Sequence, residues 1–233
     1  MNQNRFIEEL NKLGINLSDT QLNQLDKYYN LLVEYNKVMN LTGITEHDEV
    51  YLKHFYDSIT IIKTIDLNSV KSLCDIGTGA GFPGLVLKIV FPNLTVTLLD
   101  SLNKRINFLN TVIKELNLKN IEAIHARAEE YACLNRNKFD VTTSRAVAHL
   151  SNLLEYAIPM TKENGYFIAL KGNLEEELNE ASNAIKVLNV ELIEKLEFKL
   201  PIEESNRTIV KFKKNKDNKK YPRKFSEIKK NRL

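Results

Sequence analysis

The chain has 233 residues, of which 43% are hydrophobic and 27% charged, and its formal net charge is +3. This length accommodates one α/β domain with an accessory element, and the composition is ordinary for a globular protein. No apolar run approaches the roughly 18 residues that a membrane-spanning helix needs. Residues 1–9 lack the apolar segment of a secretory signal. We therefore expect neither a membrane protein nor a secreted one.

The two cysteines predict neither a disulfide framework nor a metal site. Cys74 lies in an apolar run, which predicts a small buried side chain. Cys133 has no His or Cys neighbour at the spacing typical of metal ligands. These features are typical of a reducing compartment, so we expect a cytoplasmic protein without bound metal.

Residues 1–65 are expected to form an N-terminal helical extension. Apolar residues recur at helical spacing over 22–33 and again over 55–62. Ser18 is a candidate N-cap for the first of these helices, and the turn-like segment 66–69 ends the extension.

Residues 66–214 alternate between strand-like and helix-like patterns, which indicates βαβ units and a parallel sheet. The expected strands are Val70–Asp75, Leu94–Asp100, Ile121–Ile124, Phe139–Thr143 and Gly165–Leu170. The expected helices are Phe82–Phe91, Asn103–Leu116, Leu150–Met160 and Leu174–Leu188. Two further strands, Glu191–Leu200 and Arg207–Lys213, follow without a helix between them. The prediction is an α/β fold whose mostly parallel seven-stranded sheet ends in an antiparallel edge hairpin.

Residues 215–233 are expected to form a basic C-terminal tail. From Lys211 to Leu233, eleven Lys or Arg residues face only Asp217 and Glu227, a balance of +9, so the rest of the chain carries −6. Such a tail favours a polyanionic partner, nucleic acid before a membrane surface. The alternative is a disordered tail that only aids solubility.

A glycine-rich loop follows the first expected strand, where Gly77, Gly79 and Gly81 precede a helix. Glycines at such a turn permit positive φ and let a ligand approach the backbone. We expect the N–H groups at the start of that helix to face the ligand, because ligands bind at the carboxyl ends of the strands in an open parallel sheet.

The loop admits two cofactors. Gly79-x-Gly81-x-x-Gly84 also satisfies a dinucleotide fingerprint, and Asp100 suits the ribose of either ligand. Asp75 directly before the loop favours S-adenosylmethionine, because a carboxylate attracts a sulfonium and an amino group but repels a pyrophosphate. The edge hairpin favours it too, since a second mononucleotide-binding half would be expected for a dinucleotide.

The whole chain resembles the bacterial small-subunit ribosomal RNA guanine-N7 methyltransferases, also called glucose-inhibited division protein B. The resemblance is carried by ordered motifs along the chain: Asn40–Thr42, His54–Ser58, Asp75–Gly84, Leu99–Arg105, His125–Glu129, Ser144–Ala146 and Ala169–Gly172. It implies a Rossmann-like class I methyltransferase fold. It also implies transfer of a methyl group from S-adenosylmethionine to N7 of a specific guanosine in 16S rRNA, in the small subunit or its assembly intermediate.

The resemblance, together with the glycine loop, implies a set of cofactor-binding residues: Asp75, Gly77, Gly79, Gly81, Phe82, Asp100, Ser101, Leu102, Ala128, Glu129 and Arg145. Phe82 offers an apolar wall, Asp100 can accept from the ribose, and Ala128 and Glu129 follow the third strand, where the adenine is expected. Arg145 follows the fourth strand, near the reacting centre. Structural roles for Phe82 in packing and Arg145 in an ion pair are the alternatives.

The implied target atom needs no general base, because guanine N7 carries a lone pair and no proton. Catalysis is then mainly positioning and electrostatics. We expect Arg145 to be the catalytic residue in this sense, holding the guanine or the cofactor. His54 and Asp57 lie one helical turn apart, and either a lid over the cofactor or a plain surface pair is expected from that spacing.

For RNA, phosphate contacts are expected from six basic residues: Lys104, Arg105, Lys219, Lys220, Arg223 and Lys224. The chain departs from the family pattern after Tyr221–Lys224, where it continues Phe-Ser-Glu-Ile-Lys-Lys. We expect a monomer. Two other functions are open at this point, a nicotinamide-dependent oxidoreductase and a non-enzymatic RNA-binding or assembly factor that has kept the fold.

Overall fold

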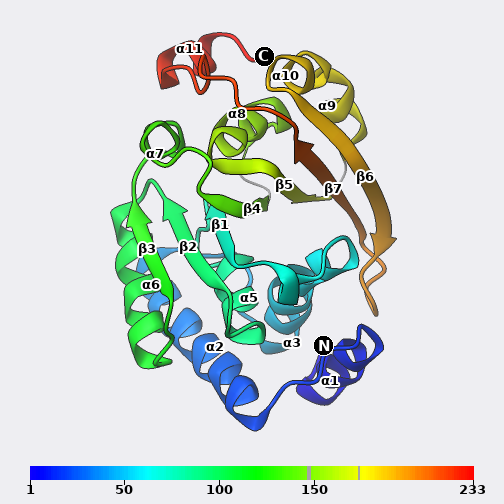
Figure 1. Cartoon of the computed structure of the whole chain (residues 1–233). Helices are drawn as coiled ribbons and strands as arrows, with labels where there is room; N and C mark the ends of the chain where they lie inside the picture. The colour runs from blue at the N-terminus through cyan, green and yellow to red at the C-terminus, as the bar shows by residue number, and fades with distance from the viewer. Residues whose placement is uncertain (146–147, 173) are drawn as a thin grey trace.

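Seven strands form one sheet in the computed structural model, which describes residues 1–145, 148–172 and 174–233 (Figure 1). Ala146, part of the Ser144–Ala146 motif, lies outside the described residues. The order is β3-β2-β1-β4-β5-β7-β6. The strands are β1 Ser72–Ile76, β2 Thr95–Asp100, β3 Ile121–His125, β4 Phe139–Arg145, β5 Thr161–Lys171, β6 Val190–Lys199 and β7 Asn206–Lys214.

The pairing confirms the predicted mostly parallel sheet with an antiparallel hairpin at one edge. β1 to β5 pair in parallel, and β7 runs antiparallel to both β5 and β6. The chain leaves β1 toward β2 and β3, and then returns to β4 on the other side of β1. This reversal opens a crevice at the carboxyl ends of β1 and β4, which is where open α/β sheets bind ligands.

Helices cover both faces of the sheet because the strand side chains alternate between two hydrophobic cores. Leu73 and Leu98 pack in the first core, and Cys74 and Leu99 in the second. The first face carries the N-terminal extension, α5 Gly84–Val90 and α6 Asn103–Glu115; the second carries α7 Ala128–Leu134, α8 Leu150–Met160, α9 Glu175–Glu180, α10 Ser182–Val187 and α11 Phe225–Lys230 (Figure 1).

Two helical details differ from the prediction. The single helix expected over Leu174–Leu188 is broken into α9 and α10 at Ala181. The short helix α7 has no counterpart among the predicted helices. It is only seven residues long and buries only Glu129 and Ala132, so it carries no clear 3.6-residue apolar pattern.

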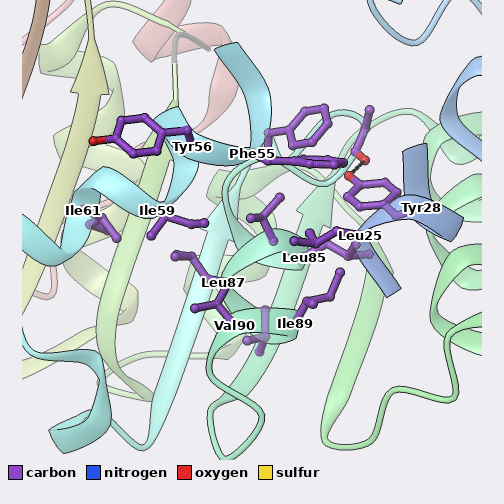
Figure 2. Close-up of a cluster of buried hydrophobic side chains, with 14 of the residues drawn as sticks. Leu25, Tyr28, Phe55, Tyr56, Ile59, Ile61, Leu85, Leu87, Ile89 and Val90 are labelled. Carbon is purple, nitrogen blue, oxygen red and sulfur yellow. Dashed lines mark hydrogen bonds between the residues drawn. The ribbon is translucent and has the colours of Figure 1, made fainter. Parts of the chain in front are cut away.

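The N-terminal extension shares its hydrophobic core with the rest of the chain. Ser18 caps α2 with a reciprocal capping box to Gln21, which confirms the predicted N-cap. Tyr28 and Phe55 pack above Leu85 of α5 (Figure 2). The elements of this extension are α1 Gln3–Lys12, α2 Asp19–Met39, α3 His47–Val50, the π-helix η1 Tyr51–Tyr56, α4 Asp57–Ile59 and the 3₁₀ helix η2 Thr60–Lys63; η3 Leu67–Ser69 then leads into β1.

The C-terminal tail is folded against the second face of the domain, so the alternative of a disordered tail is wrong, while its role in binding remains a prediction (Figure 1). Arg136 binds Asp217 through Nη2 at 2.8 Å, and Arg223 binds the buried Glu155 of α8. Ile228 of α11 is fully buried. Within the described part of the chain, no helix has both the length and the apolar character to cross a membrane.

Candidate functional site

The glycine loop after β1 has the backbone shape that its sequence predicts. Gly77, Gly79 and Gly81 have φ of 68°, 61° and 108°, a region that side chains other than glycine seldom occupy. A Cβ on Gly81 would lie 2.6 Å from the Tyr28 hydroxyl, which donates a hydrogen bond to the carbonyl oxygen of Ala80. Tyr28 of α2 therefore holds the loop in place, a contact that no sequence motif predicted.

Asp75 lies behind the loop and is fully buried. Its Oδ2 accepts from the Thr78 hydroxyl at 2.7 Å and from the backbone N–H of Gly84 at 2.8 Å, while Oδ1 is buried without a partner among the described residues. Burial raises the pKa of Asp75 to about 6, and the two hydrogen bonds oppose that rise. The first N–H of α5 thus faces this carboxylate, whereas the sequence predicted that it faces the ligand.

Two neighbouring pockets open beside the loop. The loop pocket, of about 400 Å³, is lined by Gly77, Gly79, Phe82 and Arg145, among others. The α7 pocket, of about 130 Å³, is lined by residues after β3 and on α8, namely Ala128, Glu129 and Tyr156. Because Gly77, Asp100 and Ser101 line both pockets, together they form one groove along the strand ends.

Asp100 stands where the two pockets meet. Its Oδ2 accepts from the N–H of Gly79 at 2.9 Å and from Arg105 Nη1 at 3.2 Å, and its Oδ1 accepts from the N–H of Leu102 at 2.9 Å. The carboxylate is only 2% exposed, so its orientation is set by these three donors. Acceptance of hydroxyl protons from a cofactor sugar by this carboxylate remains a prediction.

His54 and Arg145 line the loop pocket, and Asp57, which is not among its lining residues, binds Arg145. Arg145, the last residue of β4, binds Asp57 Oδ2 through Nη1 at 3.0 Å, and Arg207 Nε binds Asp57 Oδ1 at 2.9 Å. The His54 ring stacks on Phe82 with centroids 4.4 Å apart. Because Asp57 is buried and His54 lines the pocket, the surface-pair interpretation is wrong, and a lid over the cofactor remains a prediction.

His54 is a neutral ring with a defined tautomer. Burial, followed by the charge of Arg145, lowers its pKa to about 3. Its Nδ1 lies 3.2 Å from Arg145 Nη2 and from the carbonyl oxygen of Lys53, to which Arg145 Nη1 already donates. Because a guanidinium can only donate, Nδ1 accepts, and the Nε2–H donates to the Thr42 hydroxyl at 2.9 Å.

The predicted cofactor residues fall into two groups. Eight line the groove: Gly77, Gly79, Phe82, Asp100, Ser101, Ala128, Glu129 and Arg145. Asp75, Gly81 and Leu102 do not line it; they shape the loop from behind or, as Leu102 does, donate a backbone N–H. Contact of all eleven residues with a cofactor remains a prediction.

The predicted RNA-binding residues are also divided. Lys104, Lys219, Lys220 and Lys224 are exposed. Arg105 is held by Asp100, and Arg223 donates to Glu155 through Nε and Nη2 at 2.9 and 2.7 Å. Sequence reasoning did not identify Tyr28 or Tyr156 as site residues, because neither stands in a motif beside the loop. Among the described residues, no group of three or more His, Cys, Asp or Glu side chains is placed to hold a metal ion.

Comparison with solved structures shows the class I methyltransferase fold. TrmN from Thermus thermophilus has a TM-score of 0.56 at 14% identity, over 70% of this chain and 53% of that one. TYW2 from M. jannaschii, solved in complex with AdoMet, has a TM-score of 0.54 at 15% identity, over 68% and 76%. YcgJ from Bacillus subtilis has a TM-score of 0.55 at 15% identity, over 70% and 100%.

Sequence comparison is more specific. The family model GidB, rRNA small subunit methyltransferase G, matches residues 21–208. Proteins named ribosomal RNA small subunit methyltransferase G are similar over 96% of this chain: that of Lysinibacillus sphaericus is 52% identical over 96% of its own length, and that of Bacillus subtilis 51% identical over 95%. The chain therefore belongs to the GidB family of rRNA small subunit methyltransferases G.

Proposed function

We propose that this protein transfers a methyl group from S-adenosylmethionine to N7 of a specific guanosine in 16S rRNA, in the small ribosomal subunit or its assembly intermediate. One observation carries the proposal: in a chain of this family, a single groove runs from Glu129 past Asp100 to Arg145 at the strand ends. The cytoplasm, where ribosomes assemble in bacteria, is the compartment that this function requires.

The residues present fit S-adenosylmethionine better than a dinucleotide. Asp100 suits the ribose hydroxyls, Ala128 and Glu129 suit the adenine edge, and the glycine loop with Phe82 suits the methionine end. The Asp75 carboxylate already accepts from the first N–H of α5. A pyrophosphate would need that position for itself and would be repelled by the buried carboxylate. The position that an NAD-dependent oxidoreductase would use for the cofactor phosphates is therefore taken by Asp75, which argues against that alternative.

Methyl transfer to N7 requires the side chains to position the reactants and little else. When bound, S-adenosylmethionine supplies an electrophilic methyl group; the N7 lone pair forms the new bond, and the electrons of the broken C–S bond stay on sulfur. No proton moves, which agrees with a wall that contains no available base. His54 is neutral with Nδ1 occupied by Arg145, and Asp57 is held between two guanidinium groups. Arg145 then acts as a hydrogen-bond donor that orients the guanine to which the methyl group is transferred.

The carriers of RNA affinity are proposed to be Lys104 and the exposed tail lysines, which would contact phosphate and so make affinity fall with salt. Arg105 and Arg223 are weaker candidates, since each already binds a buried carboxylate.

Incubation with labelled S-adenosylmethionine and small subunits from a strain that lacks this protein tests the proposal. We expect label at N7 of one guanosine in 16S rRNA, and retention of S-adenosylmethionine but not NAD by the protein. Asp100→Ala should lose cofactor affinity, while the matched Asp66→Ala, in an exposed turn, should keep it. Label on protein or DNA, or no product at all, would overturn the assignment and leave the assembly-factor alternative.

A further inference from the structure

A second cavity lies on the other side of the His54–Arg145 wall. This hairpin cavity, of about 300 Å³, is bounded by α4, the ends of β4 and β5 and the β6–β7 hairpin. Its lining includes Asp57, Leu170, Gly172, Phe198, Arg207 and Ile209. His54 and Arg145 line both this cavity and the loop pocket, so one pair of side chains separates the two.

The lining of the hairpin cavity suits a flat heterocycle attached to a phosphate. Leu170, Phe198 and Ile209 supply apolar walls on which a base can stack. Lys53, Arg145, Lys171 and Arg207 lie around them, and Asp57 is the one carboxylate among the lining residues that the structure describes. The lining residues thus comprise four cations and one anion, and Lys53 and Lys171 are also paired with Glu49, Glu203 and Glu177 outside the cavity.

Arg145 also has N–H groups that can bind a ligand. A guanidinium carries five N–H groups. In the described part of the chain, three of them are directed to Lys53 O, Asp57 Oδ2 and His54 Nδ1, which leaves two for a ligand. Guanine presents O6 as an acceptor next to N7, whereas adenine presents an amino donor at the equivalent place. Arg145 would therefore accept guanine and oppose adenine, donor against donor.

A further hollow, of about 370 Å³, continues outward from the cavity along the hairpin. The two share Gly172, Phe198, Arg207 and Thr208, and the outer hollow adds polar residues such as Lys199 and Asn206. A base in the inner cavity would thus leave its neighbouring nucleotides room over β6 and β7.

We propose that the hairpin cavity receives the target guanine base, with O6 bound by Arg145, and that the flanking RNA runs over the β6–β7 hairpin. This inference rests on the proposed function and deepens it. The guanine enters between Gly172 and Phe198, and its N7 reaches the methyl group past the His54–Arg145 pair. The hairpin, which in this sheet forms the edge, is then part of the substrate site.

Gly172 permits a direct test of this proposal. Among the described residues, a Cβ on Gly172 would meet nothing within 4 Å, and its φ is not in the positive range, so replacing this glycine strains no backbone. The matched Leu134→Trp, at a side chain that is 87% exposed at the end of α7 and lines neither pocket, should methylate small subunits at the wild-type rate. Gly172→Trp should fill the mouth of the cavity and lower kcat/KM at least ~100-fold, the penalty typical of a misplaced substrate. Its Kd for S-adenosylmethionine, measured by calorimetry, should stay within about twofold, which also shows that the variant is folded.

A fluorescence measurement locates the RNA independently of activity. The chain has no Trp, so Phe198→Trp introduces a single reporter at the cavity wall, and Phe225→Trp a matched one on the tail. We expect a 16S rRNA fragment containing the target to quench the first reporter more strongly than the second. If the wild type methylates subunits and Gly172→Trp keeps its rate, or loses S-adenosylmethionine binding, the cavity proposal is wrong. Quenching confined to Phe225→Trp also overturns it. If the wild type methylates no RNA, it is the proposed function that fails.

Discussion

The ion pair between the tail and α8 yields the sharpest prediction, because sequence and structure assign Arg223 different partners. The Glu155 side chain is 1% exposed, and Arg223 reaches it through the backbone N–H, Nε and Nη2 at 2.8, 2.9 and 2.7 Å. Removing one partner of a buried pair costs about 3–5 kcal/mol, since it leaves an uncompensated charge. In Arg223→Met the backbone N–H still binds Glu155, so we expect the lower end, about 3 kcal/mol.

For a chain of this size, about 3 kcal/mol corresponds to a fall in Tm of roughly 6–12 °C. Thermal unfolding followed by circular dichroism at neutral pH measures it. The matched control, Lys219→Met, removes an exposed tail cation and should stay within about 0.5 kcal/mol of the wild type. A double variant, Arg223→Met with Glu155→Leu, should recover most of the loss, because an apolar pair needs no compensation. An unchanged Tm in Arg223→Met, together with lost RNA affinity, would refute this reasoning and restore the phosphate contact.

Three further outcomes are expected. Tyr28→Phe leaves the buried Ala80 carbonyl without its donor, so urea unfolding should show a loss of about 1–3 kcal/mol; no loss would mean that the loop is not held by α2. Burial raises the pKa of Asp75 from 3.8 in the unfolded chain to about 6 in the folded chain. The stability contributed by protonated Asp75 is therefore complete below about pH 4 and is lost as pH rises through about 6. Relative to the wild type, Asp75→Asn should gain stability as pH rises from 4 to 6 in denaturant titrations, and parallel curves would contradict the burial argument. Changing an exposed tail lysine that contacts phosphate to Ala should reduce the slope of log K against log salt by about one, as measured by filter binding. An unchanged slope in all three variants would mean that the tail lysines do not contact the RNA. These lysines are Lys219, Lys220 and Lys224.

Much of the fold could be predicted because it depends on local patterns. β-branched runs, turn residues and helical periodicity along 66–214 are consequences of side-chain chemistry within a few residues. The same holds for the Ser18 cap and for the positive φ of the loop glycines. Helix α7 and the break at Ala181 were not predicted, because both segments are too short for periodicity to show.

The sequence by itself determined the alternation of strands and helices, the hairpin, the glycine loop and, through its ordered motifs, the family. Tertiary structure alone decided what the charged and aromatic side chains touch. Asp75 faces the start of α5, His54 and Asp57 join Arg145 across 91 and 88 residues of chain, and Arg223 turns inward to Glu155. The physical reason is that charge and hydrogen bonding act through space. A residue's type states what it can bind, and only the packed chain places a partner within reach.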